Sequence, residues 1–304
     1  MVRNIDILYY PEKIKEQHTV VILGNFDGVH IAHSEVIKRG IDYAKNNGLM
    51  SIVLMFENNT KSAKVITSNE LKLELFADMG VDTVYIRKFT EDFMHQSPEE
   101  FIGYLIRELN MKAVSTGFDY RFGHKASGDT KTLGELSKKY GFDVLVTEAM
   151  SLEGHIISST YIRELLDIGD VETAKKYISR SYCIWGSVEK GLQNGTKLGF
   201  PTANVKYEES ANLPKNGVYA GYSEVDGIKY KCVINVGNNP TFDAQKITVE
   251  SHILDFFGNI YGKKIKVYFE KRIRDDKKFE NIEELKSAIN QDIIVARETM
   301  EGSI

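Results

Sequence analysis

Two histidines, His30 and His33, stand three positions apart directly after a glycine-rich turn. The turn follows an apolar run at residues 20–23, which predicts a short buried strand of a parallel sheet. The aliphatic spacing beyond His33 predicts a helix, so both histidines would lie on one face of its first turn. Backbone N–H groups at a helix N-terminus favour an anion, most often phosphate, and imidazoles can donate hydrogen bonds to its oxygens. The stretch is therefore a candidate phosphate-binding site.

The same spacing permits two other interpretations of the histidine pair. The two side chains could be ligands of a metal ion, although no third ligand stands at the usual spacing. They could also be ordinary surface residues at a helix start. Spacing alone leaves phosphate binding at about even odds against these alternatives.

A second polar group, Ser159, Thr160 and Arg163, stands at the predicted start of another helix. Hydroxyl groups and free backbone N–H groups at that position would form a second phosphate cradle, with Arg163 as a fixed positive charge. The alternative is a Ser/Thr helix cap followed by a solvated arginine. Spacing by itself favours the cap.

A third candidate, Asp119-Tyr120-Arg121-Phe122, follows a predicted strand at residues 113–116. The carboxyl ends of strands in an open α/β sheet are where ligands bind. Asp119 could fix a loop or a ribose, and Tyr120 and Phe122 could form the wall of a site for a planar ring. The alternative is a turn whose aromatic side chains belong to the core.

The elements that must position these residues alternate between strand and helix, which predicts a parallel sheet covered on both sides. The predicted strands lie at residues 20–23, 50–56, 83–86, 113–116 and 143–147, and the predicted helices begin after residue 33 and at Ser68, Ser97, Thr130, Ile162 and Val171. From about Tyr182, short alternating strands separated by glycine and asparagine turns predict a compact antiparallel barrel. A last helix from Asn281 should pack on the barrel. We expect two domains, 1–180 and 181–304.

The composition narrows the class of protein. Among 304 residues, 42% are hydrophobic and 27% charged, which is typical of a soluble globular chain. The net charge of −4 argues against a nucleic-acid partner. Two cysteines in a chain of this length predict buried thiols in a reducing cytosol rather than a disulfide framework. There is no apolar signal core and no run of membrane-spanning length, so we expect a cytoplasmic protein without a membrane partner.

In the order of its motifs the chain resembles the bacterial riboflavin kinase/FAD synthetase family. The matching segments are Gly24–His33, Gly117–Asp129, Ile156–Arg163, Gly199–Asn204, Gly217–Ala220, Asn235–Phe242 and Val249–Phe256. The resemblance implies an α/β Rossmann-like nucleotidyltransferase domain followed by a Greek-key antiparallel β-barrel riboflavin kinase domain. It also implies two activities. The barrel would phosphorylate riboflavin to FMN with ATP, and the α/β domain would adenylylate FMN to FAD with release of pyrophosphate, both with Mg²⁺.

The resemblance assigns roles to particular residues. His30, His33 and Arg163 would act on the transferring phosphates, and Glu250 would be the base that receives the 5′-hydroxyl proton of riboflavin. Thr202 and Asn204 would hold Mg²⁺ together with the phosphates of ATP. The expected nucleotide-binding residues are Gly24, Asn25, Phe26, Asp27, Gly28, Ser159, Thr160, Gly199 and Pro201, and the expected flavin-binding residues are Asp119, Tyr120 and Phe122.

Several positions depart from the family pattern. Ala32 stands in place of a glycine between the two histidines, and Tyr161 in place of an arginine. In the kinase part, the departures are Lys190, Thr196 and Asn239. They motivate an alternative, an FMN adenylyltransferase with a weak or inactive kinase-like barrel. A second alternative is a flavin- or nucleotide-binding regulator without catalysis. The sequence gives no indication of the oligomeric state.

Overall fold

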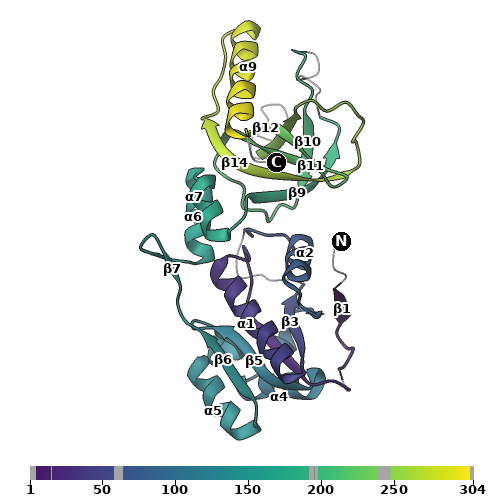
Figure 1. Cartoon of the computed structure of the whole chain (residues 1–304), viewed down its shortest axis with the longest axis vertical. Helices are drawn as coiled ribbons and strands as arrows, with labels where there is room; N and C mark the ends of the chain where they lie inside the picture. Colours follow the sequence, from purple (N-terminus) through teal and green to yellow (C-terminus); the bar gives the residue numbers. More distant parts are fainter. Residues whose placement is uncertain are drawn as a thin grey trace. The chain divides into compact units, whose positions relative to one another are not determined.

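The computed structural model describes residues 5–14, 16–57, 64–191, 195, 198–238 and 247–301. The chain forms two compact units. The first contains Met1–Ala63 and Asn69–Ser158, and the second contains Lys64–Ser68 and Ser159–Ile304. Each unit has its own sheet (Figure 1). None of the described helices is long and apolar enough to cross a membrane.

The first unit is built on a six-stranded parallel sheet in the order β1-β4-β3-β2-β5-β6. Its strands are β1 (Asp6–Tyr9), β2 (Thr19–Leu23), β3 (Met50–Phe56), β4 (Thr83–Arg87), β5 (Met111–Gly117) and β6 (Asp143–Thr147). Its helices are α1 (Ile31–Asn47), α2 (Asn69–Met79), α3 (Glu91–Met94), α4 (Pro98–Leu109), α5 (Thr130–Tyr140) and the 3₁₀ turn η1 (His124–Ala126). A small hairpin, β7 (Ser151–Leu152) and β8 (His155–Ile156), completes the unit.

Side chains of the strands alternate between two separate cores, one on each face of the sheet. Val21 and Leu23 of β2 pack in the core that holds the apolar residues of α4 and α5. Ile22, between them, packs in the core formed with α1 and Phe76 of α2. Successive side chains of a strand point to opposite faces, so a strand buried on both sides is apolar throughout. The predicted doubly covered parallel sheet is confirmed.

The second unit is a closed antiparallel barrel in the order β10-β13-β12-β11-β14-β9. Its strands are β9 (Tyr182–Glu189), β10 (Ala203–Tyr207), β11 (Gly217–Val225), β12 (Ile228–Asn238), β13 (Ile247–Ile253) and β14 (Lys264–Arg274). Three consecutive strands, β11 to β13, lie side by side, and β14 returns to pair with β11. This is the Greek-key arrangement that the family resemblance implies.

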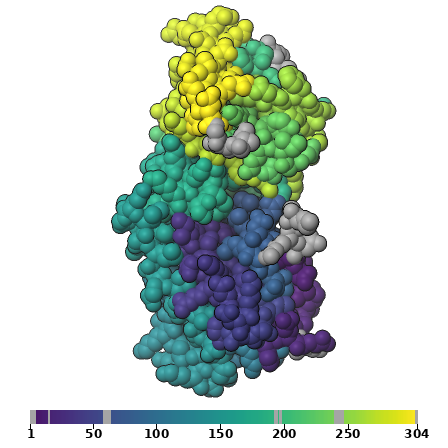
Figure 2. Space-filling model, viewed as in Figure 1, coloured from purple at the N-terminus to yellow at the C-terminus, as the bar shows by residue number. Residues whose placement is uncertain are grey.

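The C-terminal helix α9 (Ile282–Thr299) packs on the barrel, as the sequence predicts. Ala296 and Met300 share a buried cluster with Val218, Ala220 and Val233 of two barrel strands. In the space-filling view the yellow helix lies directly against the green side chains of the barrel (Figure 2). Asn281 caps the helix by accepting a hydrogen bond from the backbone of Glu284 at 2.9 Å.

Two helices before the barrel, α6 (Ser159–Ile168) and α7 (Val171–Ile178), belong to the same compact unit. Lys175 of α7 forms an ion pair with Glu270 of β14 at 2.6 Å. Gly169, between the helices, has φ +83°, and a Cβ there would lie 2.7 Å from the side chain of Arg272. The helix pair is therefore packed closely on the barrel strand β14.

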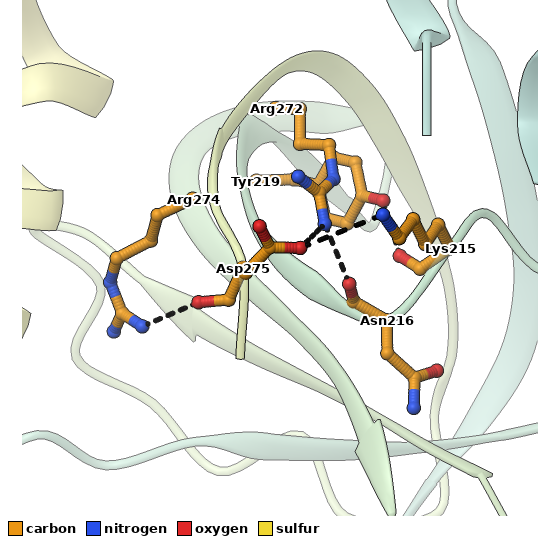
Figure 3. A network of polar contacts seen from close by, with 6 residues as sticks. All are labelled: Lys215, Asn216, Tyr219, Arg272, Arg274 and Asp275. Carbon is orange, nitrogen blue, oxygen red and sulfur yellow. Dashed lines mark hydrogen bonds and ion pairs between the residues drawn. The ribbon is translucent and has the colours of Figure 1, made fainter. Parts of the chain in front are cut away.

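Polar contacts around Arg272 extend this packing (Figure 3). Nη2 of Arg272 donates to the carbonyl of Asn216 and to Oδ1 of Asp275, both at 2.8 Å. The neighbouring Lys215 donates its backbone N–H to the carbonyl of Leu166 in α6 at 2.9 Å. The loop before β11, the end of β14 and α6 are thus connected.

A segment from the first part of the sequence also belongs to the second unit. Val65 exchanges backbone hydrogen bonds with Ser210 and Asn212, at 2.6 and 2.8 Å. The next two residues, Ile66 and Thr67, are almost fully buried. We call residues 64–68 the strap. It carries no distinctive pattern in the sequence, because its partners lie far along the chain.

The compact units divide at Ser158, whereas composition predicts a boundary at residue 181. We expect a fragment 159–304 to be more stable than a fragment 181–304, although both contain every barrel strand. The shorter fragment loses the Lys175–Glu270 pair and the burial of Ile178, and each large apolar side chain contributes about 1.5–3 kcal/mol. Denaturant unfolding of the two fragments measures the difference. Equal unfolding free energies would place the boundary at residue 181.

Candidate active sites

The loop that follows β2 is shaped by a buried aromatic residue. Phe26 has φ +49°, and Gly28 and Val29 also have positive φ, so the chain folds back sharply. A Cβ at Gly24 would lie 2.7 Å from the ring of Phe26, which explains why glycine ends the strand. The ring packs against Phe76 in the core. Of the expected nucleotide-binding residues, Phe26, Asp27 and Gly28 are buried.

The two histidines are stacked at the first turn of α1. Their ring centroids are 3.6 Å apart with an interplanar angle of 12°. His30 is the N-cap, and its Nδ1 accepts a hydrogen bond from the backbone N–H of His33 at 3.2 Å. Because Nδ1 is an acceptor, a neutral His30 carries its proton on Nε2.

A pocket of about 160 Å³ opens at the carboxyl ends of β2 and β3. It is lined by Leu23, Gly24, Asn25, Leu54, Phe56, Phe89, Phe93, Met94, Gln96, Phe101, Tyr120, Arg121, Phe122, Gly123 and Ala126. Most of these side chains are apolar or aromatic, and Arg121 carries the one charge among the described lining residues. Such a pocket suits a planar aromatic ligand with a few polar substituents.

Two of the three expected flavin-binding residues line this pocket. Tyr120 and Phe122 are stacked with centroids 5.8 Å apart. Asp119 is exposed in the turn before them and is not part of the lining. Burial raises the pKa of the Tyr120 phenol, which keeps it neutral.

The loop from Phe122 to Gly128 is closed on itself. The two residues exchange backbone hydrogen bonds of 3.1 and 2.9 Å, and a Cβ at Gly128 would lie 2.8 Å from the Phe122 ring. Asp129 then caps α5 by accepting from the Thr132 backbone at 2.9 Å and pairs with Arg121 at 3.4 Å. Gly128 and Asp129 thus fix Phe122 and Arg121, respectively, in the pocket wall.

Sequence reasoning missed four aromatic residues of the pocket, namely Phe56, Phe89, Phe93 and Phe101. Phe56 ends β3, next to β2, and the end of a neighbouring parallel strand is the signal that could have found it. Phe101 lies on the buried face of α4, where an apolar residue is typical of a helix and marks no ligand. The other two follow β4, where no regular spacing marks a ligand.

The polar group Ser159, Thr160 and Arg163 lies in α6, in the second compact unit. The helix begins at Ser159 and not at Ile162 as predicted. Tyr161 packs edge-on against Tyr177 of α7 with centroids 5.0 Å apart, so the residues before Ile162 already share the helix packing. Arg163 is half-buried on this helix. How Ser159, Thr160 and Arg163 relate to the histidine pair stays a prediction.

In the barrel, cross-strand register brings the expected kinase residues together. Glu250 of β13 is directly opposite Asn204 of β10. The hydroxyl of Thr202 donates to Oε2 of Glu250 at 3.4 Å. Glu250 and His252 are half-buried, whereas Val249 and Ser251 are buried on the other face, as the alternation of side chains along a strand requires.

Burial raises the pKa of the Glu250 carboxyl above its ordinary value, and the hydrogen bond from Thr202 lowers it in part. A raised pKa suits a general base that works near neutral pH. His252 contacts the loop that contains Pro201 and Thr202. Its ring lies 2.8 Å from the carbonyl of Pro201 through Nδ1, so a protonated Nδ1 donates to that carbonyl. The sequence gives no signal for this contact between His252 and the loop.

The remaining kinase residues surround this centre. Gly199, in the turn before Pro201, has φ +91°, a backbone conformation that glycine adopts readily and other residues rarely adopt. A Cβ at Gly191 would lie 2.2 Å from the amide nitrogen of Asn204, so this glycine allows the two to pack. Lys190 is exposed. Thr196 and Asn239 lie outside the described residues.

The donor set at this site fits a magnesium ion that is shared with a nucleotide. Among the described residues no group of three or more His, Cys, Asp or Glu side chains could hold a metal alone. Mg²⁺ usually takes one or two protein oxygens and completes its shell with phosphate oxygens and waters. Thr202 and Asn204 offer such oxygens next to Glu250.

Comparison with known proteins identifies the family. The family model for FAD synthetase matches residues 12–161, and the model for riboflavin kinase matches residues 178–300. A bifunctional riboflavin kinase/FMN adenylyltransferase of Bacillus subtilis is 36% identical over 95% of this chain and 96% of its own. The chain belongs to this family.

Other members of the bifunctional riboflavin kinase/FMN adenylyltransferase family match over similar lengths. The Listeria monocytogenes protein is 34% identical over 90% of both chains, and the Escherichia coli protein 33% over 93% of both. A solved structure described as a macrolide-efflux protein from Streptococcus pneumoniae is 29% identical, with a TM-score of 0.87 over 96% of this chain and 99% of that one. Family membership and the shared fold cover both units.

The capping role of His30 has a measurable consequence. His30→Ala removes the acceptor for the His33 N–H, and loss of an N-cap costs about 0.5–2 kcal/mol. His30→Asn removes the ring but keeps a capping oxygen. We expect the alanine variant to be less stable than the asparagine variant by about 1 kcal/mol in denaturant unfolding. Equal stabilities of the two variants would show that the cap does not hold α1.

Proposed function

We propose that this chain carries out two successive reactions with ATP. The barrel unit phosphorylates riboflavin to FMN, and the α/β unit adenylylates FMN to FAD. The observation that carries the proposal is the consecutive match of both family models, together with bifunctional relatives that align along at least nine-tenths of the chain. The placement of Glu250, Thr202 and Asn204 supports the kinase step.

In the proposed kinase step, the Glu250 carboxylate accepts the proton of the 5′-hydroxyl of riboflavin. The hydroxyl oxygen forms a bond to the γ-phosphorus of ATP, the bond from that phosphorus to the bridging oxygen breaks, and ADP leaves. Mg²⁺, when bound with ATP, would neutralise charge on the phosphates. Thr202 and Asn204 are the residues that would hold it, and the loop at Pro201 is positioned by His252.

In the proposed adenylylation step, a phosphate oxygen of FMN forms a bond to the α-phosphorus of ATP, and pyrophosphate leaves. The reaction needs no protein nucleophile or base, because the attacking oxygen is already ionised. His30 and His33 would donate hydrogen bonds to the phosphates as charge develops on the leaving group. The aromatic pocket would take the flavin ring against the side chains that line it, among them Tyr120, Phe122 and the four phenylalanines. Ser159, Thr160 and Arg163 are proposed as further phosphate contacts.

Two observations favour this reading over the alternatives. The riboflavin kinase model spans residues 178–300, which supports two activities over an adenylyltransferase alone. A pure binding protein has no need of a base with a raised pKa, and Glu250 has one. We also propose a cytoplasmic location, because both cysteines are buried and form no disulfide, as is typical of chains kept in a reducing compartment. We expect no nucleic-acid partner.

Two variants should separate the activities. His33→Ala should lower FAD formation from FMN about a hundredfold, the usual effect of removing one donor to the developing charge. Glu250→Gln keeps the shape of the side chain but cannot accept the proton, so FMN formation should fall by about a hundred- to ten-thousandfold. Each variant should retain the other activity and thereby serves as the control. Equal loss of both activities in either folded variant would contradict the assignment of two sites.

The raised pKa of Glu250 predicts opposite pH effects on catalysis and stability. The kinase rate should fall as the pH drops through this pKa, because only the carboxylate accepts the proton. Stability has the other sign: a carboxyl with a raised folded-state pKa stabilises the fold at low pH, and this contribution is lost as the pH rises through the folded value. Glu250→Gln should therefore unfold at a slightly higher temperature than wild type at neutral pH. If Glu250→Gln has the thermal midpoint of wild type, and if its kinase rate falls at low pH as the wild-type rate does, Glu250 is not the titrating group.

A further inference from the structure

Arg87 is a buried cation close to the aromatic pocket, although it is not part of the pocket lining. It ends β4, and only 9% of its surface is exposed. Its cross-strand neighbour on β3 is Phe56, which lines the pocket. The carboxyl end of β4 thus places a positive charge directly behind the pocket wall.

Aromatic rings, and not carboxylates, surround this charge. The guanidinium carbon lies 4.1 Å from the ring centroids of Tyr10 and Phe93 and 4.5 Å from that of Tyr104. Within the described ranges Arg87 forms no ion pair, and its Nε and Nη1 are buried without a hydrogen-bond partner. A buried cation is unfavourable unless something compensates it, and the faces of aromatic rings attract cations. Three rings on one guanidinium are the compensation here.

One of the three rings, Phe93, belongs to the pocket wall as well. Its centroid is 5.5 Å from that of Phe56, 5.9 Å from that of Phe89 and 5.8 Å from that of Phe101. All four phenylalanines line the pocket. Arg87 therefore holds the central ring of the wall from behind, and the position of the other three rings depends on that ring.

We propose that Arg87 is a positioning residue for flavin binding in the adenylylation step. It fixes Phe93, and through Phe93 the aromatic wall against which the flavin ring lies. The inference rests on the proposed function, because it takes FMN as the ligand of the pocket. A planar, always charged guanidinium can stack on several rings at once, which a neutral side chain of similar length cannot do.

The experiment compares Arg87→Met, Arg87→Lys and a matched control, Arg107→Met, in the full chain. Arg107 is an exposed arginine of α4 and lies outside the pocket. For each protein, kcat and the KM values for FMN and ATP are measured for adenylylation, together with the riboflavin kinase rate. Arg87→Met should raise the KM for FMN about tenfold, with kcat, the KM for ATP and the kinase rate within about twofold of wild type. Arg87→Lys keeps the charge, so its KM for FMN should stay within about threefold of the wild-type value. The control Arg107→Met should match wild type in all of these quantities.

A further variant covers the case in which Arg87→Met does not fold. Tyr10→Leu removes one half-exposed ring of the cage and none of the pocket lining, so its effect must pass through Arg87. We expect it to raise the KM for FMN about threefold. A KM for FMN at the wild-type value in either variant would overturn the proposal, as would an equal rise in the KM values for FMN and ATP. Wild-type protein without FMN adenylylation would overturn the proposed function itself, whereas a normal wild type with unaffected variants overturns only the role of Arg87.

Discussion

The alternation of side chains across the parallel sheet is the constraint on which the α/β site depends. Val21 and Leu23 are buried on one face and Ile22 on the other, so helices must cover both sides. With both faces covered, only the carboxyl edge of the strands is left for a ligand. The loops after β2, β3 and β5 meet at that edge. The pocket, the loop at Gly24 and the first turn of α1 are therefore parts of one arrangement.

In the barrel, the corresponding constraint is antiparallel register. A shift of one residue would move Glu250 to the face now held by Val249 and Ser251 and would separate it from Asn204. The closed barrel fixes this register because every strand has two neighbours. The loop that carries Thr202 is then held against β13 by the contact between His252 and Pro201. The chemistry of both units thus depends on strands whose position is set by packing elsewhere.

The sequence was a good guide to elements with a local signature. The strands 50–56 and 143–147 have the predicted bounds and the helix α5 begins at Thr130 as predicted, because capping residues, glycine turns and apolar period all act within a few residues. It was a poor guide to contacts between distant residues. No spacing indicates that Val65 pairs with residues near Ser210, or that α6 and α7 pack on β14.

The candidate sites divide in the same way. The motif residues Tyr120 and Phe122 line the pocket, and Thr202 and Glu250 are hydrogen-bonded to each other, so the motifs bring candidate site residues together. The ring of Phe26, an expected nucleotide-binding residue, fills the core under the loop, and this placement depends on Phe76 and cannot be read from the motif. The other phenylalanines that line the pocket come from β3, the loop after β4, α3 and α4. Their common role follows only from the fold.

The central claim, two successive activities in one chain, is tested most directly by a time course of wild-type protein with riboflavin and Mg-ATP. Separation of the products by liquid chromatography should show FMN first and FAD afterwards. One ADP should form for every riboflavin phosphorylated, and one pyrophosphate for every FAD. FAD formation that occurs only when FMN is supplied would contradict the kinase assignment. Accumulation of FMN without FAD would contradict the adenylyltransferase assignment.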